Sequence, residues 1–133
     1  MACISTGTSS AVLNVVFDHQ STNALLDTGA SCSLIDLGSL QSLGLDMHLA
    51  NSDNELIDAS GNKMNIIGSI DINIELNGIH LVQNMKVLNS KTFRNIILGR
   101  DFLSHFETVE FDFPKNRIKL GHQWFNCVKI KGK

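Results

Sequence analysis

Tyrosine is absent from this sequence, and proline, tryptophan and cysteine are scarce. The 133 residues include one proline, one tryptophan and three cysteines, at Cys3, Cys32 and Cys127. An odd number of cysteines without a repeated spacing argues against a disulfide framework and favours reduced thiols in an intracellular setting. The five histidines are scattered along the chain without the spacing of zinc ligands, so no metal site is expected.

Long apolar runs and an excess of basic charge are missing as well. No stretch approaches the roughly 20 apolar residues of a membrane-spanning helix. The N-terminus lacks the charged and then apolar segments of a secretory signal. A formal charge of -2, with the only lysine-rich piece at residues 129–133, argues against a nucleic-acid-binding surface. We therefore expect a cytoplasmic, single-domain protein whose partners include neither membrane nor nucleic acid.

Alternating apolar and polar residues predict that β-strands dominate the fold. In residues 70–76, isoleucine or leucine alternates with aspartate, asparagine and glutamate, which indicates one buried and one wet face. The Asn-Gly pair at residues 77–78 predicts a tight hairpin turn, after which residues 79–88 return as a strand. Other strands are expected at residues 11–17, 22–27, 45–49, 96–98, 109–113 and 117–120.

Helical periodicity is confined to a short segment. Leucines recur at intervals of three from Leu34 to Leu43, which predicts a helix with Ser33 as its N-cap and Gly44 as its end. Strand after strand with so little helix is typical of a mainly β, barrel-like domain.

An acidic residue stands where a buried strand meets small residues. The apolar run Ala-Leu-Leu at residues 24–26 leads into Asp27, and Thr-Gly-Ala-Ser follows at residues 28–31. So short an apolar run, bounded by turn-forming residues, predicts a buried strand. A carboxylate at its end is costly to desolvate unless it is hydrogen-bonded or used chemically. Because Gly29 and Ala30 leave the backbone bare, another chain or a ligand can approach closely, as at the floor of a cleft.

These residues resemble a known family. Asp-Thr-Gly-Ala at residues 27–30, preceded by Ala-Leu-Leu, is similar to the active-site strand of aspartic proteases. Residues 95–103, Asn-Ile-Ile-Leu-Gly-Arg-Asp-Phe-Leu, resemble the late apolar-apolar-Gly-Arg segment and helix of retroviral-type proteases (retropepsins). The two stretches occur in the family's order and at about its spacing. The resemblance covers residues 11–120 and is closer to retrotransposon proteases than to the well-known viral ones.

The resemblance implies a fold and a division of the chain. The fold is a mainly β, retropepsin-like acid-protease barrel with two short helices and a flap hairpin, one domain per chain. The second helix is expected at residues 100–106, after a tight crossing of Gly99 under the active strand. The expected segments are 1–10, a flexible lead-in or dimer-edge strand; 11–120, the protease domain; and 121–133, a C-terminal extension. Within the extension, residues 124–130 are expected to add a strand, form the dimer edge or lead towards a neighbouring domain.

Residues 55–68 predict a β-hairpin, because a tip of small polar residues stands between arms that contain apolar residues. On the residues alone it is an ordinary surface hairpin. The resemblance implies instead the mobile flap that folds over bound substrate. The residues expected to bind substrate in that case are Ala30, Ser31, Asp58, Ala59, Ser60, Gly61 and Ile97.

The resemblance also implies that Asp27, Thr28 and Gly29 are catalytic. Aspartic protease chemistry needs two carboxylates that share a proton, because two adjacent carboxyl groups cannot both ionise. The sequence has one Asp-Thr-Gly, so the second carboxylate must come from a second copy of the chain. We therefore expect a symmetric homodimer that acts on a polypeptide, without a metal or any other cofactor.

One position departs from the pattern of many viral relatives, which carry an acid directly after Asp-Thr-Gly-Ala. That acid pairs with the arginine of the late helix, whereas this sequence has Ser31 there and keeps Arg100. Arg100 is then expected to contact Asp101 or a backbone carbonyl. The adjacent Cys32 is expected to be a small packing residue, because a cysteine nucleophile needs a positioned histidine base.

Three functions are compatible with these features. The first is an active endopeptidase that matures a retrotransposon or retrovirus-like polyprotein, in the cytoplasm or within a virus-like particle. The second is a non-catalytic retropepsin-like dimerisation module. The third is a cellular protease domain of the DNA-damage-inducible ubiquitin-receptor type. The intact Asp-Thr-Gly-Ala favours activity, because a scaffold has no need for a buried ionisable pair.

Overall fold

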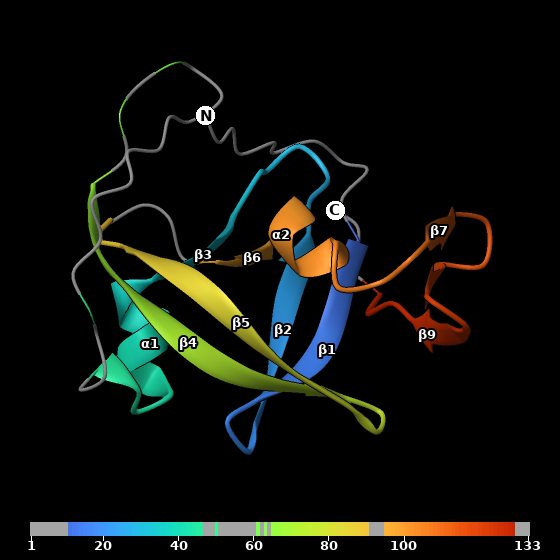
Figure 1. The fold of residues 1–133 in the computed structure, drawn as a ribbon, viewed down its shortest axis with the longest axis horizontal. Coiled ribbons are helices and arrows are strands. Elements are labelled where there is room, and N and C mark those ends of the chain that lie inside the picture. The colour runs from blue at the N-terminus through green and yellow to red at the C-terminus, as the bar shows by residue number, and fades with distance from the viewer. Residues whose placement is uncertain are drawn as a thin grey trace.

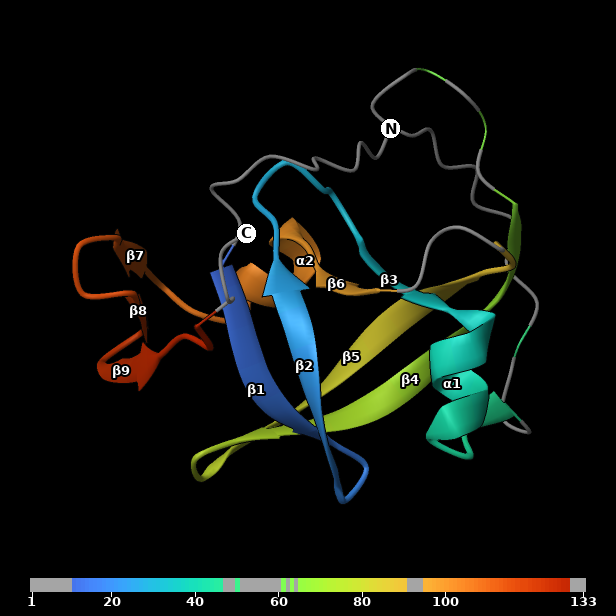
Figure 2. The same ribbon diagram turned by 180° about the vertical axis from the view of Figure 1, so that it is seen from behind.

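The computed structural model describes residues 11–46, 50, 61, 63, 65–90 and 95–129, and most of them lie in β-strands. The elements are β1 (Ala11–Phe17), β2 (Gln20–Leu26), β3 (Ser33–Asp36), α1 (Leu37–Ser42), β4 (Ile66–Leu76), β5 (Ile79–Leu88), β6 (Ile96–Leu98), α2 (Arg100–Leu103), β7 (Val109–Asp112), β8 (Arg117–Leu120) and β9 (Gln123–Asn126). Figure 1 shows the first strands forming a barrel, with β7 and β9 set to one side of it. The same separation is visible from behind in Figure 2.

The barrel closes in the strand order β1-β2-β6-β3-β5-β4 within the described residues. β6 lies parallel to β2, with Leu25 opposite Ile97 and Leu26 opposite Leu98. It lies antiparallel to β3, with Leu34 opposite Ile97. A strand from late in the chain is therefore inserted between two early strands, next to the end of β2 where Asp27 follows.

The long β4–β5 hairpin has the alternation that the sequence predicts. Isoleucines of β4 such as Ile72 and Ile74 are buried, whereas the intervening polar residues are exposed. The turn at Asn77 and Gly78 has φ values of 44° and 90°, as a two-residue turn between twisted strands requires. The predicted strands at residues 70–76 and 79–88 and the turn between them are confirmed.

The predicted helix starts in the wrong place. Residues 33–36 form strand β3, which pairs with β5 and β6, and α1 begins only at Leu37. Asp36 is the N-cap, and its carboxylate accepts a hydrogen bond from the backbone N–H of Ser39 at 3.0 Å. Burial of Leu34 between strands outweighs the helical spacing of the leucines. The predicted end is correct, because Gly44 has a φ of 71°.

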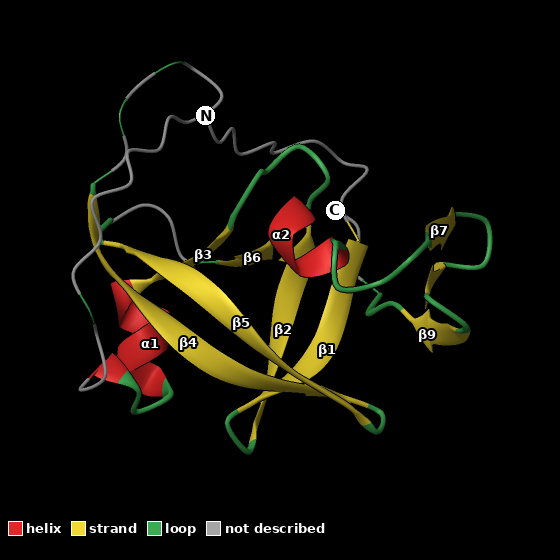
Figure 3. Ribbon diagram, viewed as in Figure 1, coloured by secondary structure: helices red, strands yellow, loops and turns green. Residues whose placement is uncertain are grey.

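The second helix is shorter than predicted. α2 ends at Leu103, and residues 104–106 continue as turns (Figure 3). The backbone N–H of His105 donates to Phe102 at 3.1 Å and that of Phe106 to Leu103 at 3.1 Å, the three-residue spacing of a tightened turn. Phe102 and Phe106 still pack edge to face, with ring centroids 5.7 Å apart.

Several predicted segments lie partly or wholly outside the described residues. In the strand expected at residues 45–49, Leu45 is buried and residues 47–49 are not described. Most of the flap hairpin at residues 55–68 is likewise not described, although residues 66–68 belong to β4. Ala50 forms an isolated antiparallel bridge with Ser69.

The end of the chain adds a strand. β9 pairs antiparallel with β8, which pairs antiparallel with β7, so the three strands form a separate sheet. Ile118, Leu120 and Phe125 of this sheet belong to the main core cluster. The backbone N–H of Val128 donates to Val12 at 2.7 Å, which ties the following segment to β1. Of the described helices, neither has the length and apolar character needed to cross a membrane.

The β4 pattern predicts unequal effects of truncation on its two faces. Ile72→Ala is expected to lower the free energy of unfolding by about 2–5 kcal/mol, because it opens a cavity in the core. Glu75→Ala, on the exposed face of the same strand, is expected to change it by about 0.5 kcal/mol or less. Urea denaturation of both variants checks this, and equal effects would contradict the assigned register.

Candidate active site

Asp27 directly follows β2 and is almost fully buried, with 4% of its surface exposed. Its backbone N–H donates to Leu98 at 3.0 Å, and its carbonyl accepts from Ala30 at 3.2 Å. The backbone N–H of Gly29 donates to Oδ1 of Asp27 at 2.8 Å. The carboxylate is therefore held by a backbone donor of its own loop.

The residues after Asp27 differ sharply in exposure. Thr28 and Gly29 are exposed, Ala30 is buried and Ser31 is half-buried. Two small exposed residues beside a buried acid leave room for another chain to approach the carboxylate. Of the three residues predicted to be catalytic, Thr28 and Gly29 thus lie at the surface, directly next to the buried Asp27.

Gly99 crosses directly under this loop. A Cβ at Gly99 would lie 2.6 Å from the carbonyl oxygen of Ala30 and 2.6 Å from that of Cys32, closer than any side chain tolerates. The backbone N–H of Arg100 then donates to the Ala30 carbonyl at 2.8 Å. The tight crossing predicted for Gly99 is confirmed. The contact expected for the Arg100 side chain stays a prediction, because the bond to Ala30 comes from the backbone N–H.

Asp101 holds the far end of the loop. The Ser33 hydroxyl donates to Oδ1 of Asp101 at 2.6 Å, and the Ser33 backbone N–H donates to Oδ2 at 3.1 Å. The Ser33 oxygen also accepts from the backbone N–H of Gly99 at 3.1 Å. The carboxylate of Asp101 thus contacts Ser33 on the loop side, while Arg100 beside it is exposed.

Sequence reasoning missed this contact. The sequence indicates Ser33 as a helix cap and Asp101 only as a partner of Arg100. A signal is nevertheless present, since Ser33 directly precedes the apolar pair Leu34-Ile35, and a hydroxyl buried with such a pair needs a hydrogen-bonding partner.

The thiol of Cys32 is unsuited to nucleophilic catalysis. Burial raises the pKa of Cys32 to about 11, and the negative charge of Asp101 adds to the increase. The thiolate, which is the reactive form, is therefore scarce at neutral pH. Cys32 packs instead against the small cluster of Ala30, Leu34 and Ile97.

The predicted substrate-binding residues are only partly described. Ile97 is buried in the cluster with Ala30, whereas the next residue, Leu98, faces the main core. Gly61 is exposed with a φ of 88° and has open space around it. Asp58, Ala59 and Ser60 lie outside the described residues. Substrate binding by these residues and by Ser31 stays a prediction.

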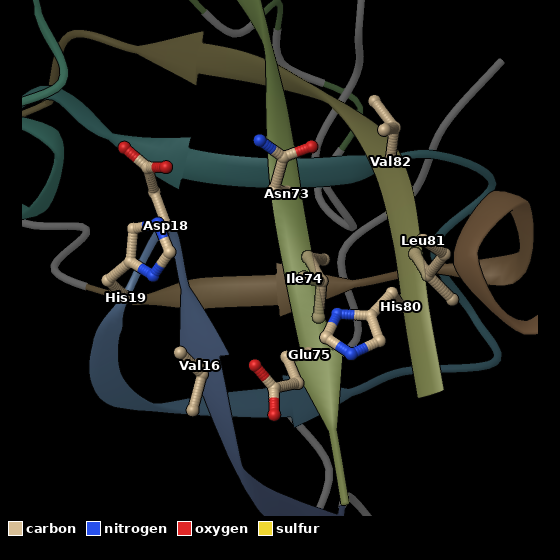
Figure 4. Close-up of a pocket in the computed structure, with 9 residues that line it drawn as sticks. All are labelled: Val16, Asp18, His19, Asn73, Ile74, Glu75, His80, Leu81 and Val82. Atoms are coloured by element: carbon tan, nitrogen blue, oxygen red, sulfur yellow. The ribbon is translucent and has the colours of Figure 1, made fainter. Parts of the chain in front are cut away.

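One cavity lies away from Asp27. It has a volume of about 330 Å³ and opens between the β1–β2 turn and the β4–β5 hairpin, and Figure 4 shows Asp18 and His19 on one side of it and Glu75 and His80 on the other. It is at the opposite end of the β1–β2 hairpin from Asp27. Among the described residues, no cluster of His, Cys, Asp and Glu side chains is arranged to hold a metal ion.

Comparison with known families finds one match, which spans both motifs. A family model described as "gag-polyprotein putative aspartyl protease" matches residues 13–105, a range that includes Asp27 and Asp101. A search of curated proteins found no match.

Several solved structures share the fold at low sequence identity. The retroviral protease-like domain of Ddi1 from Leishmania major superposes with a TM-score of 0.72 at 15% identity, over 92% of this chain and 97% of that domain. EIAV protease in complex with the inhibitor HBY-793 has a TM-score of 0.60 at 22% identity, over 77% and 92% of the two chains. A retropepsin-like aspartic protease from Rickettsia conorii has a TM-score of 0.57 at 19% identity, over 84% and 81%.

The crossing under the loop predicts that Gly99 does not tolerate a side chain. Gly99→Ala is expected to lower the free energy of unfolding by about 3 kcal/mol, because backbone must move away from the new methyl group. Gly44→Ala is the control: Gly44 has open space around it, so only its positive φ, which Gly99 does not share, adds a cost, and about 1 kcal/mol is expected. Thermal or urea denaturation measures both, and a harmless Gly99→Ala would contradict the crossing.

Proposed function

Because this chain belongs to the retropepsin-like family of gag-polyprotein aspartyl proteases, we propose that it is a homodimeric aspartic endopeptidase with Asp27 as its catalytic carboxylate. Family membership and the mainly β retropepsin fold confirm the resemblance predicted from the two motifs. The observation that carries the proposal is the geometry of Asp27, a nearly buried carboxylate fixed by backbone beside exposed Thr28 and Gly29.

The proposed enzyme needs two copies of the chain. Aspartic protease chemistry requires two carboxylates about 3 Å apart that share one proton. The sequence contains one Asp-Thr-Gly, at residues 27–29, so a two-fold axis beside Asp27 supplies the second carboxylate. Exposure of Thr28 and Gly29 supports this arrangement, because these residues have to meet their symmetry mates at the axis.

In the proposed mechanism, one Asp27 is ionised and the other is protonated. The ionised carboxylate takes a proton from a water molecule between the two, and that water attacks the scissile carbonyl carbon. The protonated carboxyl donates a hydrogen bond to the carbonyl oxygen and stabilises the charge that develops there. The bond from the Gly29 N–H to Asp27 Oδ1 keeps the carboxylate in place during these steps.

The proposed substrate is an extended polypeptide. It would lie across the loop at Ala30 and Ser31, near the apolar cluster that contains Ile97, and under a flap formed by residues 55–68. The family's link to gag polyproteins supports a precursor polyprotein as the natural substrate. Such a role places the protein in the cytoplasm or within a virus-like particle.

A cellular role is the second candidate. The similarity to the Ddi1 domain of Leishmania major covers 97% of that domain, with a TM-score of 0.72. This extent favours a protease or dimerisation domain of a cellular protein as the alternative to polyprotein maturation. Cleavage assays separate the two enzymatic roles from a purely structural one.

Replacing the catalytic carboxylate is expected to abolish cleavage. Asp27→Asn cannot act as a base, so cleavage of a peptide library should fall by about 10²-fold or more while the fold and the dimer persist. Asp71→Asn, an identical change on the exposed face of β4, is the control and should leave cleavage unchanged.

Sedimentation of both variants reports the dimer, and a statine-type transition-state mimic should inhibit the wild-type protein. Cleavage by Asp27→Asn at the wild-type rate would show that the proposed mechanism is wrong.

A shared proton also predicts a defined pH dependence. Activity should be highest at mildly acidic pH and should be lost on the alkaline side, where both carboxylates are ionised and the acid is missing. Peptide cleavage measured across the pH range checks this, with the fluorescence of Trp124, the only tryptophan, reporting that the protein stays folded. A rate that rises steadily into the alkaline range would contradict a shared proton.

A further inference from the structure

Behind the Asp27 loop, hydrogen bonds connect four side chains from distant parts of the sequence. They run from Ser33 at the start of β3, through Asp101 in α2 and Gln83 on β5, to His105 after α2. Ser33 and Gln83 are buried, and His105 is exposed. We refer to Ser33, Asp101, Gln83 and His105 as the support chain.

Asp101 is the acceptor at the centre of the support chain. Besides the two bonds from Ser33, its Oδ1 accepts from the backbone N–H of Phe102 at 2.7 Å. Its Oδ2 accepts from Nε2 of Gln83 at 2.9 Å. Four N–H and O–H donors thus converge on this carboxylate, and hydrogen bonds to a carboxylate are stronger than those between neutral groups.

The orientation of the Gln83 amide follows from its partners. Nε2 must point at the Asp101 carboxylate, because an amide oxygen there would repel it, and it also donates to the Asn84 carbonyl at 2.9 Å. Oε1 is then left to accept from Nε2 of His105, 3.1 Å away. Gln83 therefore fits this position through one donor and one acceptor, which a carboxylate of the same shape cannot supply.

The support chain is hydrogen-bonded to one end of the Asp27 loop, at Ser33. The loop is attached to β6 at Asp27, to Arg100 at Ala30, and to Asp101 at Ser33. Ser33 is attached to Asp101 by two bonds and to Gly99 by a third. Any displacement of Asp101 is consequently passed to Ser33 and to the loop that precedes it.

We propose that Gln83 is a positioning residue for the Asp27 carboxylate, acting through Asp101 and Ser33 and held in its orientation by His105. The catalytic part of this proposal rests on the proposed protease function. Nothing in the motifs at residues 27–30 and 95–103 indicates Gln83, which lies in the middle of a strand between them.

Other titratable groups lie near the support chain, so a variant that adds charge there needs a control that adds the same charge elsewhere. Cys32 lies in the loop, and the charges of Asp101 and of Lys86 on β5 act on it in opposite directions. Arg100 directly precedes Asp101, and His105 follows it by four residues. A variant that adds charge at Gln83 is therefore best compared with one that adds the same charge elsewhere on β5.

The test replaces Gln83 with glutamate. In Gln83→Glu, two carboxylates face each other where an amide met a carboxylate, so at neutral pH kcat should fall about tenfold with little change in KM. At acidic pH the two carboxyl groups can share one proton, which restores a donor, and kcat should return towards the wild-type value. The alkaline limb of the pH profile should therefore move to lower pH.

Asn84→Asp is the matched control. Asn84 lies next to Gln83 on β5, and its Nδ2 donates to Oδ1 of Asp71 at 2.8 Å on the exposed face. The control thus adds the same charge, opposite a carboxylate, without touching the support chain. Identical pH profiles for Gln83→Glu and Asn84→Asp would overturn the proposal.

Amide hydrogen exchange provides a readout that does not depend on activity. The N–H groups of Gly29, Ala30 and Ser33 should exchange faster in Gln83→Glu than in Asn84→Asp at neutral pH, and at equal rates at acidic pH. If the wild-type protein shows no cleavage that depends on Asp27, the proposed function fails, and exchange still decides whether the support chain positions the loop.

A second variant covers the case in which Gln83→Glu does not fold. His105→Ala removes an exposed side chain and should preserve the fold while releasing the Gln83 amide. It should speed exchange at Ser33 and lower kcat by about twofold to fivefold. Unchanged exchange and unchanged kcat in this variant would overturn the proposal.

Discussion

The close crossing of Gly99 under the Asp27 loop is the constraint on which the rest of the site depends. Two backbone segments approach so closely there that only a hydrogen atom fits between them. The crossing allows Leu98, Arg100 and Asp101 to hold the loop at its start, middle and end. The crossing also requires β6 to lie between β2 and β3. The order of the strands in the barrel therefore determines the position of the Asp27 carboxylate.

Burial and exposure at the loop have complementary roles. The side chain of Asp27 is almost fully buried, and its carboxylate accepts a hydrogen bond from the backbone N–H of Gly29. Its neighbours Thr28 and Gly29 remain at the surface, where the proposed second copy and substrate would meet. In the proposed dimer, half of the catalytic centre would thus be preformed in each chain, which would limit the entropy lost on assembly.

The sequence was most informative where local chemistry decides the structure. The alternation in residues 70–76 and the Asn-Gly turn predicted the β4–β5 hairpin, and two motifs predicted the family and the retropepsin fold. It was least informative where a distant partner decides. The local sequence predicts Ser33 as a helix cap, but in the structure Ser33 is hydrogen-bonded to Asp101. Strand β3 takes the place of the first turn predicted for the first helix. The support chain escaped prediction because its members are far apart in sequence and carry no motif.

The parallel pairing of β2 with β6 has a consequence for biosynthesis. Residues 25 and 26 emerge from the ribosome before β3, β4 and β5, whereas their partners Ile97 and Leu98 follow only after these strands have been made. Long-range pairing of this kind forms late in folding, because a large loop must close first. The loop after β2 therefore gains its contacts with Leu98, Arg100 and Asp101 only once translation has passed residue 101. If the proposed protease function holds, the order of the strands thereby delays cleavage by the nascent chain.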